Sequence, residues 1–225
     1  MLSFFIDKCF FLSHTSLMAE SSIETKKRLL ESAKKEFLEK GFTGASLRTI
    51  AANAGVTTGA MYRHFKDKDS FFCALVDDAI AATKQVIMLA DPKNHENVAM
   101  EQMQEHIDFE KKSTEDFLNY VYENFDAFTL LFRKSAGSTH EHFQEEICDL
   151  YTKNCEKTFA WMYEQKIATK QVSPMTIHFM ASTIINAFCD IILHNMPQKE
   201  AKEYLSDIME FTSFGGYKLL GIKVE

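Results

Sequence analysis

The chain has 225 residues and a mass of 25.8 kDa, enough for one large domain or for a small domain beside a larger one. Hydrophobic residues make up 46% and charged residues 25%, the balance of a soluble globular protein. Only 8 glycines and 3 prolines are present, which disfavours turn-rich sandwiches, barrels and disordered chains. No uninterrupted apolar run reaches the roughly 18 residues of a membrane span. The composition therefore predicts a soluble, mostly helical protein.

The net charge of −7 is unevenly distributed along the chain. Residues 19–70 carry ten Lys or Arg and seven Asp or Glu, a net charge of +3, whereas residues 71–225 carry a net charge of −10. An extended polyanion would therefore meet the segment 19–70 rather than the acidic remainder of the chain.

The first seventeen residues are rich in phenylalanine but carry Asp7 and Lys8 at their centre. A secretory signal begins with basic residues and continues with an unbroken apolar stretch, so this segment fits a signal poorly. The polar run after Met18 is typical of a protein start. We interpret residues 1–17 as an upstream extension from a misplaced start codon. The alternative is an amphipathic segment that packs on the domain or on a membrane.

Two helices are expected before residue 55. Apolar residues recur with a 3.6-residue period over 22–40, and Gly41 is suited to end that helix. The same pattern predicts a shorter helix over 46–54, with Ser46 as its N-cap and Gly55 just past its end.

A third short helix is expected over 57–64, with Thr57 as its N-cap and with Ala60 and Phe65 facing inward. It follows the preceding helix after a tight turn of Ala, Gly and Val. Two short helices joined in this way are typical of a helix-turn-helix motif.

Six further helices are expected in the rest of the chain. The first starts near Asp69 or Ser70 and runs to about Ala90. The others are predicted at 97–112, 114–134, 139–166, 174–196 and 198–214. The pair Gly215-Gly216 either ends the last helix or kinks it. No strand-like alternation is present, so the sequence predicts an all-α protein of about nine helices.

The sequence from Gly41 to Lys68 contains the patterns I-A-x-x-A-G-V-[ST]-x-G-x-[LMI]-Y-x-[HY]-F and K-x-K, and it follows the pattern G-[FY]-x-x-[TS]-[ST] except at Ala45. With these patterns it resembles the DNA-binding signature of TetR/AcrR-type transcriptional regulators over roughly residues 20–75. Thr58 departs from the pattern, since many relatives place a basic residue there, so one phosphate contact is expected to be missing. The resemblance implies a three-helix helix-turn-helix DNA-binding domain over 18–68 and a larger helical ligand-binding and dimerisation domain over 69–225.

Nine residues of this segment are candidates for DNA contact. A short helix with small residues at its N-terminus can bring its backbone close to the bases of the major groove. The fork of Arg63 can pair with guanine, Tyr62 offers a phenol to phosphate, and Lys68 is placed near the backbone. The alternatives are plain helix caps for the hydroxyl residues and core or solvated positions for the others. The candidates are Ser46, Arg48, Thr57, Thr58, Gly59, Tyr62, Arg63, His64 and Lys68.

A single helix-turn-helix reads only about four or five base pairs, so a homodimer on a palindromic operator is expected. The last two predicted helices are the expected interface. The segment 174–196 is apolar around much of its circumference, and Phe211 and Phe214 add an apolar stripe on the next helix. Burial of these residues in the core of the monomer is the alternative.

A ligand site is expected among the middle helices, which are unusually aromatic. The resemblance implies a small-molecule effector whose binding changes the spacing of the two recognition helices. The alternative is that each aromatic residue is simply part of the hydrophobic core. The candidate residues are Phe117, Tyr120, Phe125, Phe128 and Trp161.

No catalytic, metal or cofactor site is expected. His142 and Glu146 have ligand spacing on a helix, but no third ligand is apparent. The sequence lacks the HExxH, Walker, G-x-S-x-G and dinucleotide-binding patterns. The five scattered cysteines form no C-x-x-C pair, so we expect small buried thiols in a reducing cytosol.

Together these patterns predict a cytoplasmic, homodimeric, ligand-responsive DNA-binding repressor with no membrane association and no enzymatic activity. The alternative is an all-α small-molecule-binding protein or enzyme with a vestigial DNA-binding domain.

Overall fold

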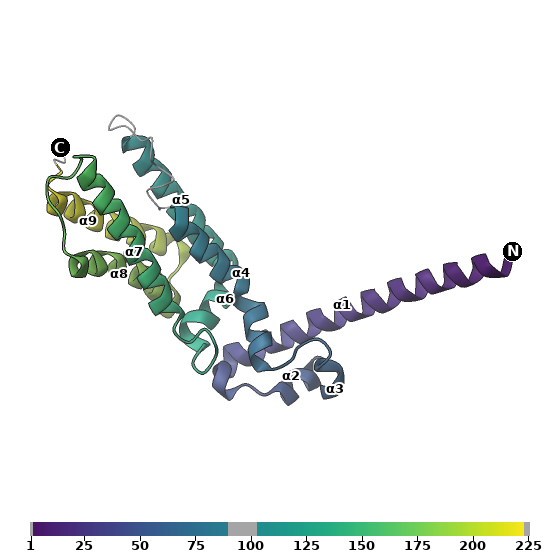
Figure 1. The fold of residues 1–225 in the computed structure, drawn as a ribbon. Coiled ribbons are helices and arrows are strands. Elements are labelled where there is room, and N and C mark those ends of the chain that lie inside the picture. Colours follow the sequence, from purple (N-terminus) through teal and green to yellow (C-terminus); the bar gives the residue numbers. More distant parts are fainter. Residues whose placement is uncertain (1, 90–102, 223–225) are drawn as a thin grey trace. The chain divides into compact units, whose positions relative to one another are not determined.

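The protein is described by a computed structural model of residues 2–89 and 103–222, with the side chains of residues 21–89 and 111–222 (Figure 1). Within these ranges the regular structure is helical and includes no strand, which confirms the predicted all-α class. The chain divides into two compact units. The first comprises the chain up to Leu75 together with Lys134–Ser138, and the second comprises Val76–Arg133 and the chain from Thr139 onward.

The first unit begins with α1 (Leu2–Gly44), followed by α2 (Leu47–Asn53) and α3 (Thr58–Met61). The backbone of α1 passes through Ser22 without a break, so the predicted helix start there is wrong. Ser22 has no helix end to cap, because the chain before it is already helical. Gly41, with φ 70° and ψ 171°, interrupts the helical backbone where the sequence predicts the end of the first helix.

The two predicted N-caps of the helix-turn-helix are confirmed. The Ser46 hydroxyl accepts a hydrogen bond from the Thr49 N–H at 3.4 Å. The Thr57 hydroxyl accepts one from the Ala60 N–H at 3.2 Å. Each hydroxyl thus satisfies one N–H group that the first turn of its helix leaves without an intrahelical partner.

α3 is shorter than predicted and ends at Met61 rather than at His64. The N–H groups of Arg63 and His64 donate to the carbonyls three residues back at 3.3 and 2.9 Å. This tighter bonding closes the last turn of a short helix. Met61 is completely buried, whereas Ala60, which the sequence pattern places inside, is only half-buried. Phe65 is buried as predicted.

A buried carboxylate joins α1 to α2. Glu36 is only 4% exposed, and its Oε1 accepts hydrogen bonds from the Ser46 N–H at 3.1 Å and from the Lys40 ammonium at 3.2 Å. One turn earlier on α1, the Ser32 hydroxyl donates to the carbonyl of Ile50 at 2.9 Å. Because a charged acceptor binds an N–H more strongly than a neutral one, Glu36 holds the start of α2 against α1.

The segment 134–138 packs against the C-terminal end of α1. The Thr43 hydroxyl donates to the carbonyl of Ala136 at 2.7 Å. Gly137 has a φ of +88°, and a Cβ built on it would lie 2.9 Å from the Thr43 hydroxyl oxygen. Only glycine fits this position without strain and a close contact. A segment distant in the sequence is thereby part of the first unit.

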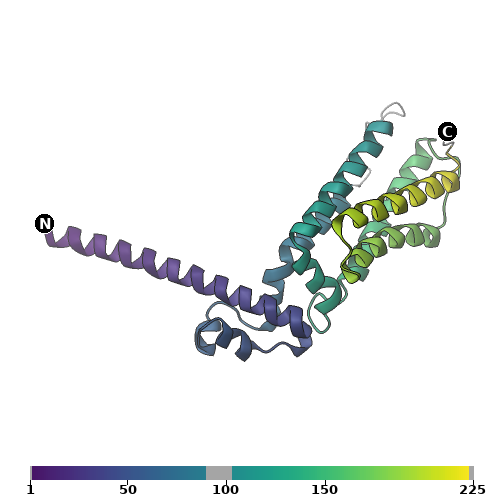
Figure 2. The ribbon, with the colours of Figure 1, turned by 180° about the vertical axis from the view of Figure 1, so that it is seen from behind.

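The second unit is a bundle of longer helices (Figure 2). α4 (Lys68–Leu89) starts in the first unit and continues into the second, where α7 packs on α8 and α8 packs on α9. The remaining elements are α5 (Met103–Glu123), α6 (Phe125–Thr129), the π-helical turn η3 (Leu130–Lys134), α7 (Phe143–Glu164), α8 (Pro174–Leu193) and α9 (Gln198–Leu220).

Helix boundaries in the second unit differ from the prediction at several places, and α7 begins at Phe143 rather than at residue 139 because residues 139–142 form a turn. α5 runs through Ser113, so the predicted break before residue 114 is wrong, and the chain breaks at Asn124 instead. The predicted helix over 97–112 lies partly outside the described residues. α9 continues through the two glycines to Leu220. Gly216 is buried, and a Cβ there would lie 2.7 Å from Cε of Met180, so the missing side chain lets α8 and α9 approach closely.

α8 is the one helix in the described residues that is long and apolar enough to cross a membrane, with a mean hydropathy of 1.5. It also packs against α7 and α9, and much of its apolar surface is buried between them. The core helix of a bundle has this composition for that reason.

The four cysteines in the described part of the chain are free thiols. Cys189 is buried, and burial raises the pKa of its thiol to about 12, so it stays protonated as a small apolar side chain. Cys73, Cys148 and Cys155 are half-buried rather than fully enclosed. The side chain of Cys9 lies outside the described residues.

The contact between α1 and α2 gives a first prediction. Replacing Glu36 by Ala leaves the Ser46 N–H and the Lys40 ammonium without their shared acceptor, so we expect the free energy of unfolding to fall by about 1–3 kcal/mol. Urea denaturation followed by circular dichroism measures this loss. Glu39→Ala is the matched control, because Glu39 is exposed on the same helix, and we expect a change within about 0.5 kcal/mol. Equal losses in the two variants would contradict the role of Glu36.

Candidate nucleic-acid interface and internal cavity

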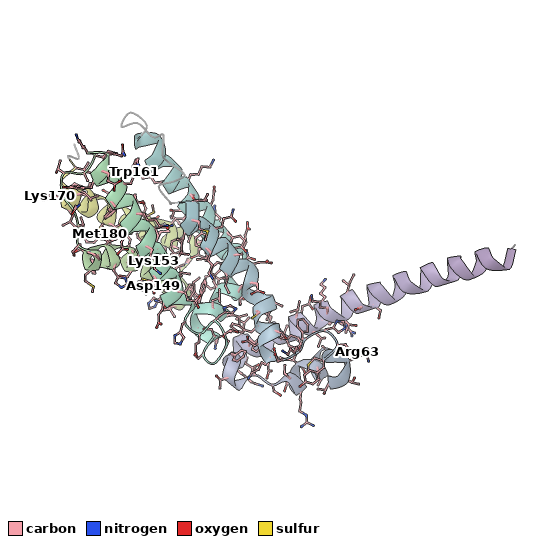
Figure 3. All side chains as sticks on the ribbon, in the orientation of Figure 1. Arg63, Asp149, Lys153, Trp161, Lys170 and Met180 are labelled. Atoms are coloured by element: carbon pink, nitrogen blue, oxygen red, sulfur yellow. The ribbon has the colours of Figure 1, made fainter. Side chains whose placement is uncertain are left out.

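The turn after α3 presents two adjacent side chains to solvent. Tyr62 is 52% exposed, and Arg63 is also exposed, on the outer side of this turn (Figure 3). The neighbouring Met61 and Phe65 are buried. The apolar side chains of this short segment therefore hold it in place, while a phenol and a guanidinium project outward.

The N-terminal end of α3 is small and open. Thr57, Thr58 and Gly59 are exposed, and a Cβ built on Gly59 would meet no atom within 4 Å. The packing of the chain itself therefore does not require glycine at this position. The absence of a side chain instead leaves the backbone of α3 accessible to a large partner, as a helix that enters the major groove needs.

The other predicted contact residues differ in how accessible they are. Arg48 is exposed in the first turn of α2, whereas Ser46 is half-buried and its hydroxyl is used as the N-cap. His64 is half-buried. The structure thus brings Arg48, Tyr62 and Arg63 to the surface of one compact unit, with Ser46 placed by its capping bond.

Lys68 has partners within the protein. Its ammonium donates to the carbonyls of Thr43 and Ala45 at 3.1 and 3.3 Å, and lies 4.8 Å from the ring centre of Phe42. These contacts fasten the start of α4 to the loop between α1 and α2. Sequence reasoning missed this role, because the two carbonyls lie more than twenty residues away along the chain. A phosphate contact from the same ammonium stays a prediction.

An apolar cavity of about 140 Å³ lies among α4 to α9 of the second unit. We call it the apolar lobe. Two of the predicted ligand residues, Phe117 from α5 and Phe128 from α6, line it, and their contact with a ligand stays a prediction. The full lining is Thr83, Val86, Ile87, Leu89, Ser113, Thr114, Phe117, Val121, Phe128, Phe132, Ile147, Tyr151, Ile184, Ile185, Phe188, Ile192 and Met209.

A second cavity of about 190 Å³, which we call the mixed lobe, adjoins the first. Its lining comes mainly from the C-terminal parts of α7 and α9 and from the α8 region around Met180. Thr114, Tyr151, Ile184 and Met209 line both lobes. The polar part of the mixed lobe includes Asn154, Thr158, Thr212 and Ser213.

Three predicted ligand residues lie outside both linings. Tyr120 packs edge-to-face on Phe128 at 6.2 Å between ring centres, and Phe125 packs on Tyr122 at 5.6 Å. Trp161, on α7, packs on a small apolar cluster that includes Met162 and Leu220. Sequence reasoning chose aromatic residues and missed the α8 isoleucines, although the apolar circumference of that helix was a usable signal.

The histidine and acidic residues at the start of α7 lie close together at an exposed helix end. The two ring nitrogens of His142 each lie 3.4 Å from a carboxylate, of Glu141 and of Glu145. Glu146 instead faces the Lys84 ammonium at 3.9 Å. His142 and Glu146 thus have different partners, which is typical of a solvated helix end rather than of a shared metal ligand set.

Residues 29–75 match the family described as "Bacterial regulatory proteins, tetR family". The HTH-type transcriptional repressor AcnR of Corynebacterium diphtheriae is 32% identical over 85 residues, which cover 33% of this chain and 45% of that protein. The HTH-type transcriptional repressor BepR of Brucella suis biovar 1 is 36% identical over 74 residues, which cover 33% of this chain and 35% of that protein. The matched region thus spans less than half the length of these curated relatives.

The crystal structure of NalD, the secondary repressor of the MexAB-OprM multidrug efflux pump in Pseudomonas aeruginosa, superposes with a TM-score of 0.54. It is 23% identical and covers 85% of this chain and 96% of its own, a likeness of fold. The fold and the exposed turn define an all-helical protein with an N-terminal helix-turn-helix domain. Residues 29–75, which contain the helix-turn-helix, are thus similar to bacterial regulatory proteins of the tetR family.

The contacts of Lys68 give a second prediction. Lys68→Met keeps the aliphatic stem but removes two hydrogen bonds and the cation above the Phe42 ring, so we expect the free energy of unfolding to fall by about 1–2 kcal/mol. Urea denaturation measures the change. Lys66→Met is the control, because Lys66 is exposed two residues away. If both variants unfold at the same urea concentration as the parent protein, the Lys68 contacts do not stabilise the fold.

Proposed function

We propose that this protein is a transcriptional repressor that binds a palindromic operator as a homodimer and releases it when a small molecule occupies the internal cavity. The observation that carries the DNA-binding part is the exposure of Tyr62 and Arg63 beside the fully buried Met61. The packing of the chain itself does not require an exposed phenol, an exposed guanidinium or a glycine here, whereas each is suited to contact with DNA.

Each exposed group has a definite chemical role on DNA. The planar fork of Arg63 can donate two hydrogen bonds to guanine in the major groove, and the Tyr62 hydroxyl can donate to a phosphate oxygen. Arg48 supplies a positive charge near the start of α2. The net charge of +3 over residues 19–70 favours the approach of a polyanion, in contrast to the acidic remainder of the chain.

The proposed dimer interface is an exposed apolar patch on α8 and α9. Met175 and Phe179 on α8 are 75% and 65% exposed, and Phe211 and Phe214 on α9 are 68% and 57% exposed. Large apolar side chains gathered on adjacent helices are typical of an interface. The burial of other α8 residues accounts for the opposite side of the same helix, so the core alternative explains only part of its apolar character.

The proposed response to a ligand is supported by the path of the chain after α6. Phe128 and Phe132 line the apolar lobe, and two residues after Phe132 the chain enters the segment 134–138, which belongs to the helix-turn-helix unit. There, Thr43 binds the carbonyl of Ala136. A ligand that displaces the two rings would therefore shift the chain that leads into this segment. The hydrogen bond between Thr43 and Ala136 would transmit that shift to the end of α1, just before the start of α2.

The remaining parts of the proposal follow from the family. The named relatives are transcriptional repressors, so we propose a regulator without enzymatic activity that acts in the cytoplasm, where its DNA partner is found. The alternative, a ligand-binding protein or enzyme with a vestigial helix-turn-helix, would show ligand binding or turnover without salt-dependent binding to DNA.

Operator binding gives a third prediction. A footprint on the DNA upstream of the gene locates the operator, and fluorescence anisotropy then measures affinity as a function of salt concentration. We expect Arg63→Ala to weaken binding by about 1–3 kcal/mol and to relax base preference at one position. We expect Tyr62→Ala to weaken binding to every sequence. Gly59→Val is expected to block binding while the protein stays folded, because a side chain would separate α3 from the groove.

A control separates loss of fold from loss of contact. Lys66→Met and Lys68→Met are compared for the slope of affinity against salt concentration, at temperatures where both variants are folded. A lower slope in Lys68→Met alone assigns the phosphate contact to Lys68. Unchanged operator affinity in Arg63→Ala, Tyr62→Ala and Gly59→Val together would overturn the DNA-binding proposal.

The apolar patch gives a fourth prediction. We expect the parent protein to sediment as a dimer at micromolar concentration, and Phe179→Glu with Phe211→Glu to sediment as a monomer, because two buried carboxylates would oppose each other across the interface. Tyr163→Glu serves as the control, since Tyr163 is 41% exposed on α7, and it should remain a dimer. A parent protein that sediments as a monomer contradicts the proposed interface.

A further inference from the structure

We infer that the internal cavity takes an uncharged ligand built of two apolar parts, with a hydrogen-bond donor on the part that enters the mixed lobe. This inference rests on the proposed function, in which the same cavity is the effector site, and it adds the chemical class of the effector. Charge, shape and hydrogen bonding each support it.

The described lining of the two lobes contains no Asp, Glu, Lys, Arg or His. A charged ligand group would therefore lose its hydration on entry and gain no counter-charge from these residues, which is strongly unfavourable in an apolar environment. Aromatic and aliphatic side chains make up most of the apolar lobe, including Phe117, Phe128 and Phe188. The cavity thus selects neutral molecules over both cations and anions of the same shape.

The shape of the cavity indicates a ligand of two parts. The apolar lobe has a volume of about 140 Å³, close to the ~150 Å³ of an engineered apolar cavity that holds one benzene ring. The mixed lobe is slightly larger, at about 190 Å³. Thr114, Tyr151, Ile184 and Met209 contribute to both linings, so the two lobes adjoin. A molecule with one ring-sized group in each lobe would occupy the whole space.

Asn154 places a fixed hydrogen-bond acceptor in the lining of the mixed lobe. Asn154 is 4% exposed, and its Nδ2 donates to the carbonyl of Ile87 at 2.7 Å. This bond fixes the orientation of the amide and leaves its Oδ1 as an acceptor. The hydroxyl of Thr158 donates to the carbonyl of Asn154, and the hydroxyl of Thr212 donates to the carbonyl of Ile208. Each of these three side chains already donates within the protein, so a ligand that carries a donor can pair with Oδ1 of Asn154.

A matched set of biphenyls tests the inference by isothermal titration calorimetry on the full-length protein. 4-Phenylphenol is neutral at pH 7 and has two rings and one O–H donor. Biphenyl-4-carboxylate and 4-phenylbenzylamine add a negative and a positive charge to the same frame, and 4-methoxybiphenyl removes the donor. We expect 4-phenylphenol to bind at least about tenfold more tightly than each of the other three compounds.

Variants locate the binding site and the acceptor. Thr114→Phe fills the junction of the two lobes and should abolish binding, whereas Asp116→Phe, at an exposed position on the same helix, should not. In Asn154→Leu we expect the preference for 4-phenylphenol over 4-methoxybiphenyl to disappear, while 4-methoxybiphenyl still binds. Retained binding of the ether shows that the cavity is intact in this variant.

The outcomes separate this inference from the proposed function. If either charged biphenyl binds as tightly as 4-phenylphenol, if Thr114→Phe leaves binding unchanged, or if no compound binds, the ligand class is overturned, while operator binding by the parent protein is untouched. Should 4-phenylphenol bind as expected but fail to weaken the operator complex in anisotropy measurements, the ligand class stands and the proposed ligand response is overturned.

Discussion

The exposed surface of the helix-turn-helix depends on the burial of Met61 and Phe65. α3 has a single turn and is too short to be stable on its own, so its position comes from packing. Phe65 stacks on Phe71 of α4 at 3.8 Å between ring centres, and the Lys26 ammonium of α1 lies 5.9 Å from the same ring. Burial of each large apolar side chain contributes about 1.5–3 kcal/mol. Tyr62 and Arg63, which lie between these two anchors, are directed to solvent as a result.

A cluster of aromatic rings supports the same unit from the other side. Phe37 and Phe42 of α1 and Phe72 of α4 have ring centres 5.4–5.9 Å apart, in stacked and edge-to-face arrangements. The ammonium of Lys68 lies above Phe42. These contacts join the helix before the motif to the helix after it, so the geometry of α2 and α3 is set by their flanking helices.

The second unit uses one helix for two purposes. α8 contributes Ile184 and Phe188 to the lining of the apolar lobe, while Met175 and Phe179 on the same helix are exposed. A helix that packed on the bundle with one face and met solvent with the other would be polar on its outer face. The apolar circumference of α8 therefore corresponds to two different environments. One side of the helix lines the cavity, and another carries the exposed apolar patch.

The sequence by itself determined the features that depend on near neighbours. The caps at Ser46 and Thr57, the positive φ at Gly41 and the helix-turn-helix pattern all arise from side chains within a few residues of the backbone they affect. Tertiary structure alone decided that Lys68 donates to two distant carbonyls and that Met180 packs against the backbone at Gly216. It also decided which of the predicted aromatic residues line the cavity, as Phe117 and Phe128 do and Trp161 does not. These outcomes depend on which helix faces meet, and periodicity shows that a face is apolar without showing what will cover it.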